Sequence, residues 1–412
     1  MGGHRAGRCH RKFCPLSQVS PLHGCGAPPA RLRRSLRHSY MAHMTVPLAS
    51  ALPSTQAVIT TDILVIGAGQ AGLSSAYHLK QRRLDPGRGF IVIDAAPAPG
   101  GAWQYRWPSL TLATVNRVHD LPGMAFAEAL DSRLDTVQAA VAVPRYFAAY
   151  EARFDLPVAR PVTARLVGPR GDRFRIETDR GVFSARGLIN ATGTWENPFI
   201  PDVPGRDRFA GRQLHTRDYR QAEDFAGQHV VVVGGGISAI QLLDEISRVT
   251  RTTWVTRRPP LFTEAPFDAE AGRQAVALVE DRVRRGLPPA SVVSVTGLPM
   301  TPRIAAMRAR GVLERQPMFD DLTETGLRWA DGRELAADVV VWCTGFRSAL
   351  DHLAPLDLRE PGGGITMTGR LATQVARDPR IHLVGYGPSA STIGANRAGA
   401  VAARELMETL GI

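Results

Sequence analysis

Residues 62–72 read Asp-Ile-Leu-Val-Ile-Gly-Ala-Gly-Gln-Ala-Gly, so the pattern Gly-x-Gly-x-x-Gly comes directly after a short apolar run. The run predicts a buried parallel strand, and the apolar stripe that follows the glycines predicts a helix. A second apolar run, 90–93, ends on Asp94. This order of strand, glycine turn, helix and strand predicts a unit that binds a dinucleotide.

The glycines of this first motif have separate expected tasks. Gly67 permits a tight turn, Gly69 lets the backbone approach a pyrophosphate, and Gly72 allows close packing of helix on strand. Gln70 lies in the first turn of a helix whose N-terminus faces the phosphates. Asp94 is placed to accept hydrogen bonds from ribose hydroxyls, and the alternative is an ordinary aspartate at a strand end.

The same plan recurs farther along the chain. Residues 229–239 read His-Val-Val-Val-Val-Gly-Gly-Gly-Ile-Ser-Ala. Gly234 and Gly236 occupy the first two glycine positions, Ser238 lies in the first helical turn, and Ala239 replaces the third glycine. We therefore predict a second dinucleotide-binding unit.

The second unit carries a signal for its nucleotide. Arg257 and Arg258 follow its second strand, predicted at 253–256. Two guanidinium groups there can bind a 2′-phosphate, whereas an acidic residue favours NAD. This position favours NADPH, and the alternative is a pair of solvated surface arginines.

Each unit is followed by a predicted hairpin and a strand that ends in a Thr-Gly pair. The first strand is 187–190 and the second is 338–342. A strand at 381–384 is expected to rejoin the first sheet, so one copy of the architecture is inserted in the other. The segment 259–320 departs from this plan and is interpreted as decoration, with a helix predicted from Asp268 to Val283.

Charge is concentrated at the start of the chain. The net charge is +12, but residues 1–44 hold eight of the 50 Lys and Arg and no Asp or Glu, which leaves 42 basic against 38 acidic residues. This extension lacks apolar periodicity and is expected to be disordered. The remaining excess of +4 suits an enzyme that binds phosphates, so no nucleic acid partner is expected.

Cysteine usage and hydropathy exclude several classes of protein. The four cysteines form no CxxC pair, so neither a zinc site, nor a disulfide framework, nor a redox dithiol is expected. No apolar run has the roughly 18 residues of a membrane span. The chain is therefore expected in a reducing cytoplasm, with no metal.

The pattern Phe209-x-Gly211-x-x-x-His215-x-x-x-Tyr219, just before the second glycine motif, resembles the signature of flavin-containing monooxygenases and of their N-hydroxylating and Baeyer–Villiger relatives. The final Tyr resembles the first two groups more than Baeyer–Villiger enzymes. The segment 100–103 and the two Thr-Gly strand ends also resemble this family, and the likeness covers roughly residues 60–405.

The resemblance implies an α/β fold of two Rossmann-like domains, with an NADPH domain inserted into an FAD domain and a β-hairpin in each. It implies that NADPH reduces FAD, that O2 adds to the reduced flavin as a hydroperoxide, and that a small-molecule substrate takes one oxygen atom. The expected segments are a basic N-terminal extension at 1–57, the FAD domain at 58–195 and 335–412, and the NADPH domain at 196–334.

The resemblance also suggests roles for particular residues. Asn116 is the candidate for a polar catalytic group beside the flavin, with a turn Asn as the alternative, and His215 is expected in a linker near NADP⁺. Trp103, Tyr105 and Trp107 line the substrate cavity or pack in the core. The expected cofactor-binding residues are Gly67, Gly69, Gln70, Gly72, Asp94, Gly101, Trp103, Thr192, Gly193, His215, Gly234, Gly236, Ser238, Arg257, Arg258, Thr344, Gly345, Gly385 and Gly394.

Two alternatives compete with a monooxygenase. A disulfide reductase of the same architecture needs two redox cysteines near the flavin, and the sequence has no such pair. A flavoprotein reductase, redox sensor or regulatory subunit that binds both nucleotides without oxygenation stays open. The motifs describe the cofactors only, so neither the substrate nor the oligomeric state is predicted.

Overall fold

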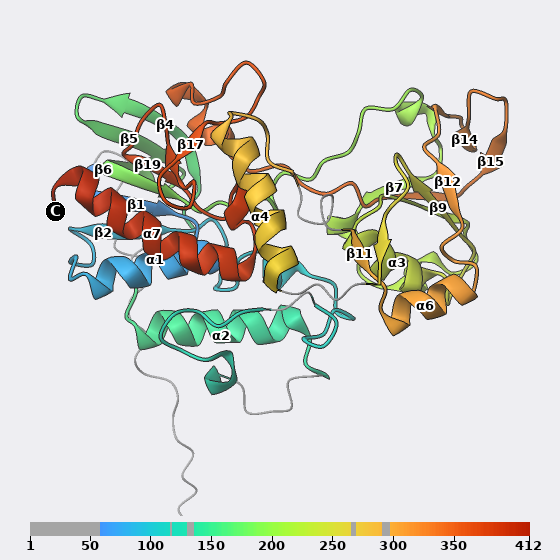
Figure 1. Cartoon of the computed structure of the whole chain (residues 1–412), viewed down its shortest axis with the longest axis horizontal. Helices are drawn as coiled ribbons and strands as arrows, with labels where there is room; N and C mark the ends of the chain where they lie inside the picture. The colour runs from blue at the N-terminus through green and yellow to red at the C-terminus, as the bar shows by residue number, and fades with distance from the viewer. Residues whose placement is uncertain (1–57, 116–117, 130–135, 265–268, 291–296) are drawn as a thin grey trace, which may run out of the picture. The chain divides into compact units, whose positions relative to one another are not determined.

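The computed structural model describes residues 58–115, 118–129, 136–264, 269–290 and 297–412, all within one compact unit that spans residues 46–412. Two large sheets organise this unit, and one is inserted in the sequence of the other, as predicted (Figure 1). The first sheet is mixed and the second is parallel. The expected extension 1–57 and Asn116 lie outside the described residues.

The first sheet has the strand order β17-β18-β19-β6-β1-β2-β3, and the hairpin of β4 and β5 continues from β6. The pairs that β1 makes with β2 and β6, and that β19 makes with β6, are parallel. The strands of this sheet are β1 (Val58–Ile66), β2 (Phe90–Ile93), β3 (Val158–Ala159), β4 (Ala164–Arg170), β5 (Arg173–Thr178), β6 (Gly181–Asn190), β17 (Met367–Thr368), β18 (Gln374–Val375) and β19 (Ile381–Leu383).

Strand β6 differs from the expectation of a short hairpin strand followed by a separate strand. It runs unbroken for ten residues, pairing with β5 at its start and with β1 along most of its length. Its alternate residues fill both cores of the first sheet, so no turn is needed between the two predicted strands. The predicted return of the chain at β19 is confirmed.

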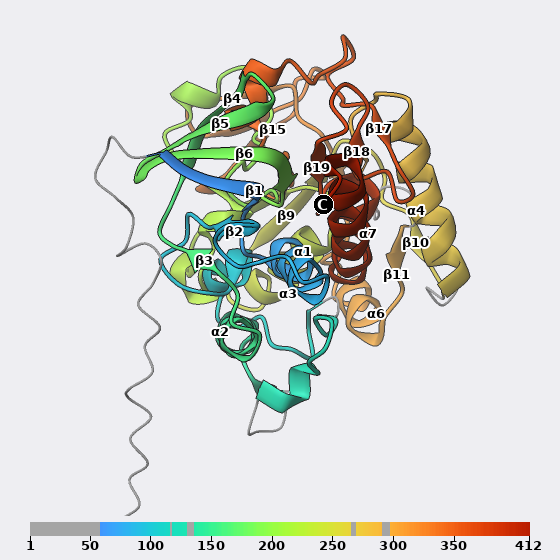
Figure 2. The same cartoon turned by 90° about the vertical axis from the view of Figure 1, so that its left-hand side faces the viewer.

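Helices α1 (Gln70–Gln81) and α7 (Thr392–Leu410) lie side by side against the first sheet (Figures 1 and 2). Gly399 allows this approach, because a Cβ there would lie 2.8 Å from the Ser74 hydroxyl and 2.9 Å from the amide of Ser75. Helix α2 (Ala139–Arg153), which the sequence did not predict, completes the same apolar core through Tyr146 and Phe147.

The second sheet has five parallel strands in the order β12-β9-β8-β16-β7. Its strands are β7 (Arg212–His215), β8 (Val230–Val233), β9 (Thr252–Thr256), β12 (Arg315–Pro317) and β16 (Val339–Trp342). Helices α3 (Ile237–Ile246) and α6 (Pro302–Ala309) pack against it in a shared apolar core. Small sheets complete this half: β10 (Phe262–Thr263) with β11 (Leu298–Pro299), and β13 (Asp321–Leu322) with β14 (Gly326–Arg328) and β15 (Glu334–Ala336).

Strand β16 corrects an expected domain boundary. The segment 335–412 was assigned to the first domain, yet β16 is hydrogen-bonded between β8 and β7 in the middle of the second sheet. All four of its residues are buried there. The N–H and C=O groups of this buried strand find their hydrogen-bond partners only in the second sheet. The chain therefore returns to the first domain after Trp342.

Helix α4 (Ala269–Arg284) belongs to the segment 259–320 that was interpreted as decoration. The helix lies close to its predicted position in sequence, but it packs on β17 and on the turn Gly387–Ser389 of the first domain. Val283 is fully buried in the core of the first sheet, and the guanidinium of Arg284 donates to the carbonyl of Gly369 at 2.8 Å.

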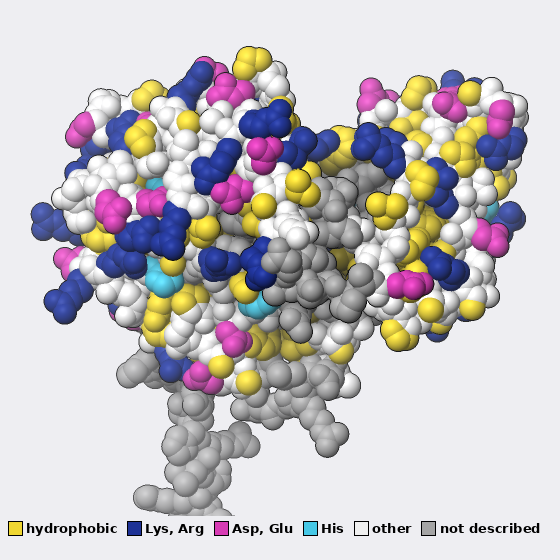
Figure 3. All heavy atoms as spheres, in the orientation of Figure 1, with side chains coloured by type: hydrophobic (Ala, Val, Ile, Leu, Met, Phe, Trp, Pro, Cys, Tyr) yellow, Lys and Arg dark blue, Asp and Glu magenta, His cyan; other side chains and the backbone are white. Residues whose placement is uncertain are grey.

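Short 3-10 helices occupy several connections: η2 (Gly101–Tyr105), η3 (Phe126–Ala129), η5 (Arg206–Arg208), η6 (Thr216–Asp218), η7 (Ala222–Phe225), η8 (Asp351–Leu356) and η9 (Gly387–Ser389). No helix among the described residues is long and apolar enough to cross a membrane. The described part of the chain also contains no group of acidic, His and Cys side chains that could hold a metal ion. Basic and acidic side chains are interspersed on the face shown in Figure 3, and the absence of a nucleic acid partner stays a prediction.

Candidate cofactor-binding and active site

The first glycine motif forms a turn with one open position. Gly67 has φ +105°, and a Cβ there would lie 2.5 Å from the carbonyl oxygen of Ala191. A Cβ at Gly72 would lie 1.8 Å from the carbonyl oxygen of Gly67. A Cβ at Gly69, in contrast, meets nothing within 4 Å. The backbone is thus packed tightly on both sides of a space at the N-terminus of α1, which fits a pyrophosphate.

Asp94 closes one side of this turn. Its carboxylate accepts hydrogen bonds from the amides of Ala68 at 2.6 Å and Ala96 at 3.0 Å, and it lies 3.9 Å from the guanidinium of Arg160. Burial raises the pKa of this carboxyl group, while the two amides and Arg160 oppose the rise. The carboxylate is therefore held next to the glycine turn, where a ribose would follow the pyrophosphate.

The loop of residues 100–106, which we call the flavin loop after its expected role, lies over Gly69. Gly101 has φ +51°, and a Cβ there would lie 3.1 Å from the Cα of Gly69. Trp103 is half-buried and packs against the cores of both sheets. This loop is thus brought to the first glycine motif from about 30 residues away in sequence, at the position expected for a flavin contact.

Gln70 contacts other parts of the protein. Its side-chain amide donates to the carbonyl of His119 at 3.1 Å and to the side-chain oxygen of Asn396 at 2.9 Å. Its own carbonyl oxygen is buried without a hydrogen-bond partner among the described residues. Gln70 therefore ties α1 to α7 and leaves one acceptor unused.

The second glycine motif has the same geometry as the first. Gly234 has φ +145°, and a Cβ there would lie 2.2 Å from the carbonyl oxygen of Cys343, whereas a Cβ at Gly236 meets nothing within 4 Å. Ala239 is fully buried at the third position, and Ser238 is half-buried in the first turn of α3. Two glycine turns with open space beside the backbone thus lie at the N-termini of α1 and α3.

The arginines expected to select the nucleotide lie at the end of β9. Arg257 and Arg258 are exposed and form no ion pair with a described residue. Beside them, the guanidinium of Arg315 donates to the hydroxyl of Thr256 at 2.7 Å. Arg315 was not predicted, because its strand β12 joins β9 only through a long-range parallel pairing.

The chain passes between the two sheets after β6 and again after β16, and threonine hydroxyls join these two connections to each other. The hydroxyl of Thr192 donates to the carbonyl of Ala349 at 2.7 Å, and that of Thr344 donates to the carbonyl of Phe199. Each threonine therefore binds the opposite connection. Thr192 and Thr344 were expected to bind a cofactor, and in the structure their hydroxyls join the two connections.

Gly193 and Gly345 extend this junction. The carbonyl of Gly193 accepts from the amide of Ala349 at 3.0 Å, and that of Gly345 accepts from the amide of Phe199 at 2.9 Å. Both glycines have positive φ values, +63° and +81°. We refer to residues 191–199 and 343–350 as the linker pair.

His215 holds the linker pair from the end of β7. Its Nε2 lies 2.9 Å from the carbonyl oxygen of Gly345, and its Nδ1 accepts from the amide of Arg217 at 3.2 Å. These partners require a neutral ring with the proton on Nε2. Burial lowers the pKa of His215, which favours the same form. The ring therefore acts as a fixed hydrogen-bond donor to the linker pair, and its expected place near NADP⁺ stays a prediction.

Aromatic rings stack on one another at the linker pair. Tyr105 stacks on Trp195 with ring centres 6.1 Å apart, and Trp195 stacks on Phe346 at 5.3 Å. Trp107, expected either in the cavity or in the core, is almost fully buried and packs edge-on to Tyr219 at 5.9 Å, so it belongs to the core. Tyr105, Trp195 and Phe346 form what we call the aromatic cluster.

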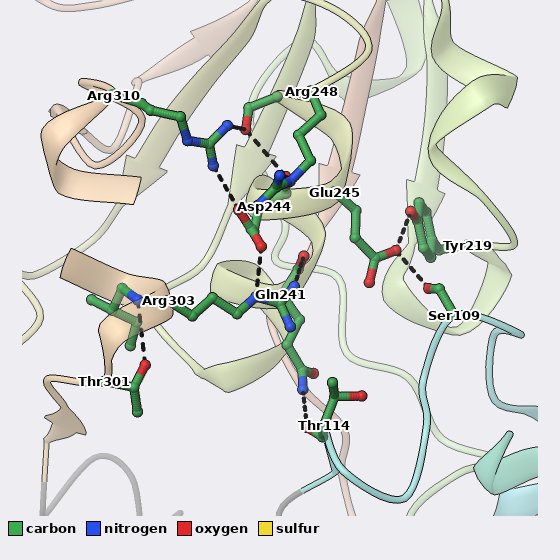
Figure 4. Close-up of polar contacts among 12 residues, drawn as sticks. Ser109, Thr114, Tyr219, Gln241, Asp244, Glu245, Arg248, Thr301, Arg303 and Arg310 are labelled. Atoms are coloured by element: carbon green, nitrogen blue, oxygen red, sulfur yellow. Dashed lines mark hydrogen bonds and ion pairs between the residues drawn. The ribbon is translucent and has the colours of Figure 1, made fainter. Parts of the chain in front are cut away.

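The last residue of the monooxygenase-like motif contacts α3 (Figure 4). The hydroxyls of Tyr219 and Ser109 both donate to the same carboxylate oxygen of Glu245, each at 2.7 Å. Gln241, one turn earlier, donates to the carbonyl of Thr114 at 3.0 Å. The segment after the flavin loop is therefore fastened to α3, and the motif tyrosine is part of the attachment.

Gly394, one of the expected cofactor-binding residues, lies in the first turn of α7, which begins at Thr392. The amide of Gly394 donates to the hydroxyl of the N-cap residue Ser391 at 3.0 Å, so this amide is already satisfied within the helix. Gly385 has φ +72° and lies against Ala71 of α1, with 3.6 Å from its Cβ position to that side chain. This turn is thus adjacent to the first glycine turn.

Comparison with known proteins agrees with this geometry. The profile of the pyridine nucleotide-disulphide oxidoreductase family matches residues 64–271. A flavin-containing monooxygenase structure from Stenotrophomonas maltophilia superimposes with a TM-score of 0.71 and 36% sequence identity, over 85% of this chain and 99% of that one.

Two sequence relatives point the same way. An indole-3-pyruvate monooxygenase, YUCCA1, from Oryza sativa subsp. japonica is 27% identical over 74% of this chain and 80% of its own length. An uncharacterized oxidoreductase, CzcO, from Bacillus velezensis is 26% identical over 70% of this chain and 82% of its own length. The expected cofactors, FAD and NADPH, are confirmed by these likenesses. With two glycine motifs that fit two dinucleotides, the chain belongs to the pyridine nucleotide-disulphide oxidoreductase family and, within it, to the flavin monooxygenases.

Proposed function

We propose that this protein uses NADPH, bound FAD and O2 to transfer one oxygen atom to a small organic substrate. The observation that carries the proposal is the pair of open glycine positions, Gly69 and Gly236, each at a helix N-terminus and each flanked by tightly packed glycine or alanine positions. Two such sites suit one enzyme that passes electrons from one dinucleotide to another.

In this proposal the first site binds FAD. Amides at the start of α1 bind the pyrophosphate above Gly69, and the carboxylate of Asp94 accepts from the ribose. The loop at Gly101 and Trp103 approaches the same turn and is assigned to the flavin ring. When bound and reduced, FAD supplies the activation of O2, for which amino acid side chains have no counterpart.

The second site binds NADPH. Amides at the start of α3, near Gly236 and Ser238, bind its pyrophosphate, and Arg257 and Arg258 bind its 2′-phosphate. Arg315 adds a third positive charge at the end of β9, held by Thr256. Three arginines at one position favour the phosphorylated nucleotide.

The linker pair and the aromatic cluster supply the environment of the reaction. His215 is a neutral hydrogen-bond donor to the linker, so no proton transfer is assigned to it. Trp195 and Phe346 provide apolar faces that exclude water near the flavin loop. Exclusion of water protects reactive intermediates from side reactions. Asn116 keeps its predicted role as a polar group beside the flavin.

The test is incorporation of isotopically heavy O2. The FAD-loaded protein is incubated with NADPH and heavy O2 together with amines, sulfides, ketones and indole-3-pyruvate, since the rice relative is named for that substrate. A product that carries one heavy oxygen atom supports the proposal. If every compound is left unchanged while NADPH is consumed and hydrogen peroxide is made, the protein is a reductase or an oxidase.

A further inference from the structure

Arg106, at the end of the flavin loop, is a cation without an anionic partner. Its Nε is buried and makes no hydrogen bond to any described residue, and no ion pair joins its guanidinium to a described carboxylate. Burial lowers its pKa to about 10, and no acidic group raises it. A desolvated charge without a partner is unfavourable, so its position calls for an explanation.

Another buried arginine of the same domain shows how the fold treats a structural cation. Arg160 donates two hydrogen bonds to the carboxylate of Glu151, at 2.6 and 2.9 Å, and lies 3.9 Å from Asp94. Its charge is therefore balanced by two carboxylates. The Nε of Arg160 is also buried without a hydrogen bond, so the two arginines differ in their carboxylate partners: Arg160 has two, and Arg106 has none among the described residues.

Aromatic rings hold Arg106 in place. Its guanidinium carbon lies 4.6 Å from the ring centre of Trp195 and 5.7 Å from that of Trp103. Cation–π contacts orient the guanidinium plane without occupying its N–H donors. The Nε of Arg106 thus keeps an unused donor, and no carboxylate among the described residues binds the guanidinium.

The surroundings of Arg106 indicate what kind of ligand fits. The loop that carries it covers Gly69 of the first glycine turn, and Trp195 belongs to the linker pair. Tyr105 and Phe346 each stack on Trp195 and are half-buried. One unpaired guanidinium with flat apolar faces beside it matches a carboxylate attached to an aromatic or other planar group.

We propose that Arg106 binds the carboxylate of an organic substrate, so that the enzyme prefers aromatic carboxylic acids over their neutral analogues. This subsite rests on the proposed oxygenation, because it lies between the flavin loop and the linker pair. The same anionic chemistry could come from a cofactor phosphate, and the experiment separates the two sources.

The experiment measures binding, independently of turnover. Pairs of a carboxylate and its amide (benzoate and benzamide, phenylacetate and phenylacetamide, 3-phenylpropanoate and its amide) are titrated into the FAD-loaded full chain by calorimetry and by tryptophan fluorescence. At least one carboxylate is expected to bind about tenfold or more tightly than its amide, as a charge-assisted hydrogen bond predicts. If no pair shows this preference in the unmodified protein, the proposal is wrong.

Variants assign the preference to Arg106. Arg106→Gln is expected to remove it, and Arg106→Lys to keep part of it, because Lys retains the charge without the planar fork. Arg217→Gln is the matched control: this guanidinium also lies over Trp195, at 5.8 Å, but it is paired with Glu196 at 2.9 Å. Arg217→Gln should keep the preference.

Cofactor binding tests the alternative that Arg106 binds a cofactor phosphate. The dissociation constants of FAD and NADP⁺ are measured for the same variants. If Arg106→Gln weakens one of them about tenfold and leaves the carboxylate preference intact, the guanidinium belongs to a cofactor phosphate and the proposal is overturned. A protein that binds carboxylates selectively but transfers oxygen to no substrate would refute the proposed function and leave the carboxylate subsite standing.

Discussion

The open position at Gly69 gives a sharp prediction for Gly69→Ala. Gly69 has φ −82° and ψ −168°, which an alanine adopts without strain, and its Cβ would meet no protein atom within 4 Å. As the N-cap of α1, an alanine costs at most about 1 kcal/mol of stability. The new methyl group would, however, occupy the space assigned to the pyrophosphate.

We therefore expect Gly69→Ala to fold and to lose FAD. Each charge-assisted hydrogen bond that the phosphate loses costs about 1.5–3 kcal/mol, or roughly ten- to hundredfold in Kd. The assay is the ratio of flavin to protein absorbance after purification, followed by titration with FAD and a melting curve.

Two glycines serve as controls for this prediction. Gly168→Ala lies on β4, where the added Cβ also meets nothing within 4 Å, and should keep its FAD. Gly72→Ala places a Cβ 1.8 Å from the carbonyl oxygen of Gly67 and should fail to fold. The reasoning is refuted if Gly69→Ala purifies with the flavin content and the Kd of the unmodified protein.

Three further predictions concern the nucleotide, acid stability and packing. Arg257→Ala should raise the KM for NADPH about tenfold or more and leave that for NADH unchanged, and equal changes would remove its assigned role. Burial lowers the pKa of His382 to about 3, so the protein should be most stable above pH 6.5 and lose about 1.4 kcal/mol per pH unit per such histidine as the pH falls toward 3. His382→Gln should reduce that slope in denaturant titrations, and an unchanged slope would contradict the assignment. Asp244→Asn should destabilise the protein by about 3 kcal/mol without loss of FAD. This buried carboxylate of α3 accepts from three arginines: Arg248 in the turn after α3, Arg303 of α6 and Arg310 directly after α6 (Figure 4). An unchanged melting temperature would show that the three ion pairs contribute nothing.

The features that sequence predicted well are local. Both glycine motifs were predicted at their positions, because a residue with φ near +105° or +145° directly after an apolar run is almost always glycine. The strands β1 and β8 were predicted from short β-branched runs, which suit buried parallel strands. The insertion of one unit in the other followed from the repeated order of these elements.

The features that sequence did not predict depend on pairing between distant segments. Strand β16 resembles the strands of either sheet in composition, and only its hydrogen bonds to β7 and β8 assign it to the second. Helix α4 was predicted in sequence, but the domain on which it packs was not. Arg315 reaches the end of β9, beside Arg257 and Arg258, through the pairing of β12 with β9. No local sequence pattern predicts this pairing.

The same limit applies to the candidate site. Arg106 was not predicted because an arginine beside two tryptophans is a common surface pattern, and only the folded contacts show that its Nε is buried without a partner. Thr192 and Thr344 follow strands as expected, yet their hydroxyls bind each other's connection. Sequence patterns thus located the two glycine turns and missed the contacts that join the two sheets.

The central claim, that the reduced protein transfers oxygen, is tested most directly by rapid mixing. The FAD-loaded protein is reduced anaerobically with NADPH and mixed with oxygenated buffer while the flavin spectrum is recorded. The account predicts a transient species whose spectrum differs from those of both reduced and oxidised flavin and whose decay accelerates when a substrate is present. Direct return to the oxidised spectrum in a single step, unaffected by any substrate, would contradict it.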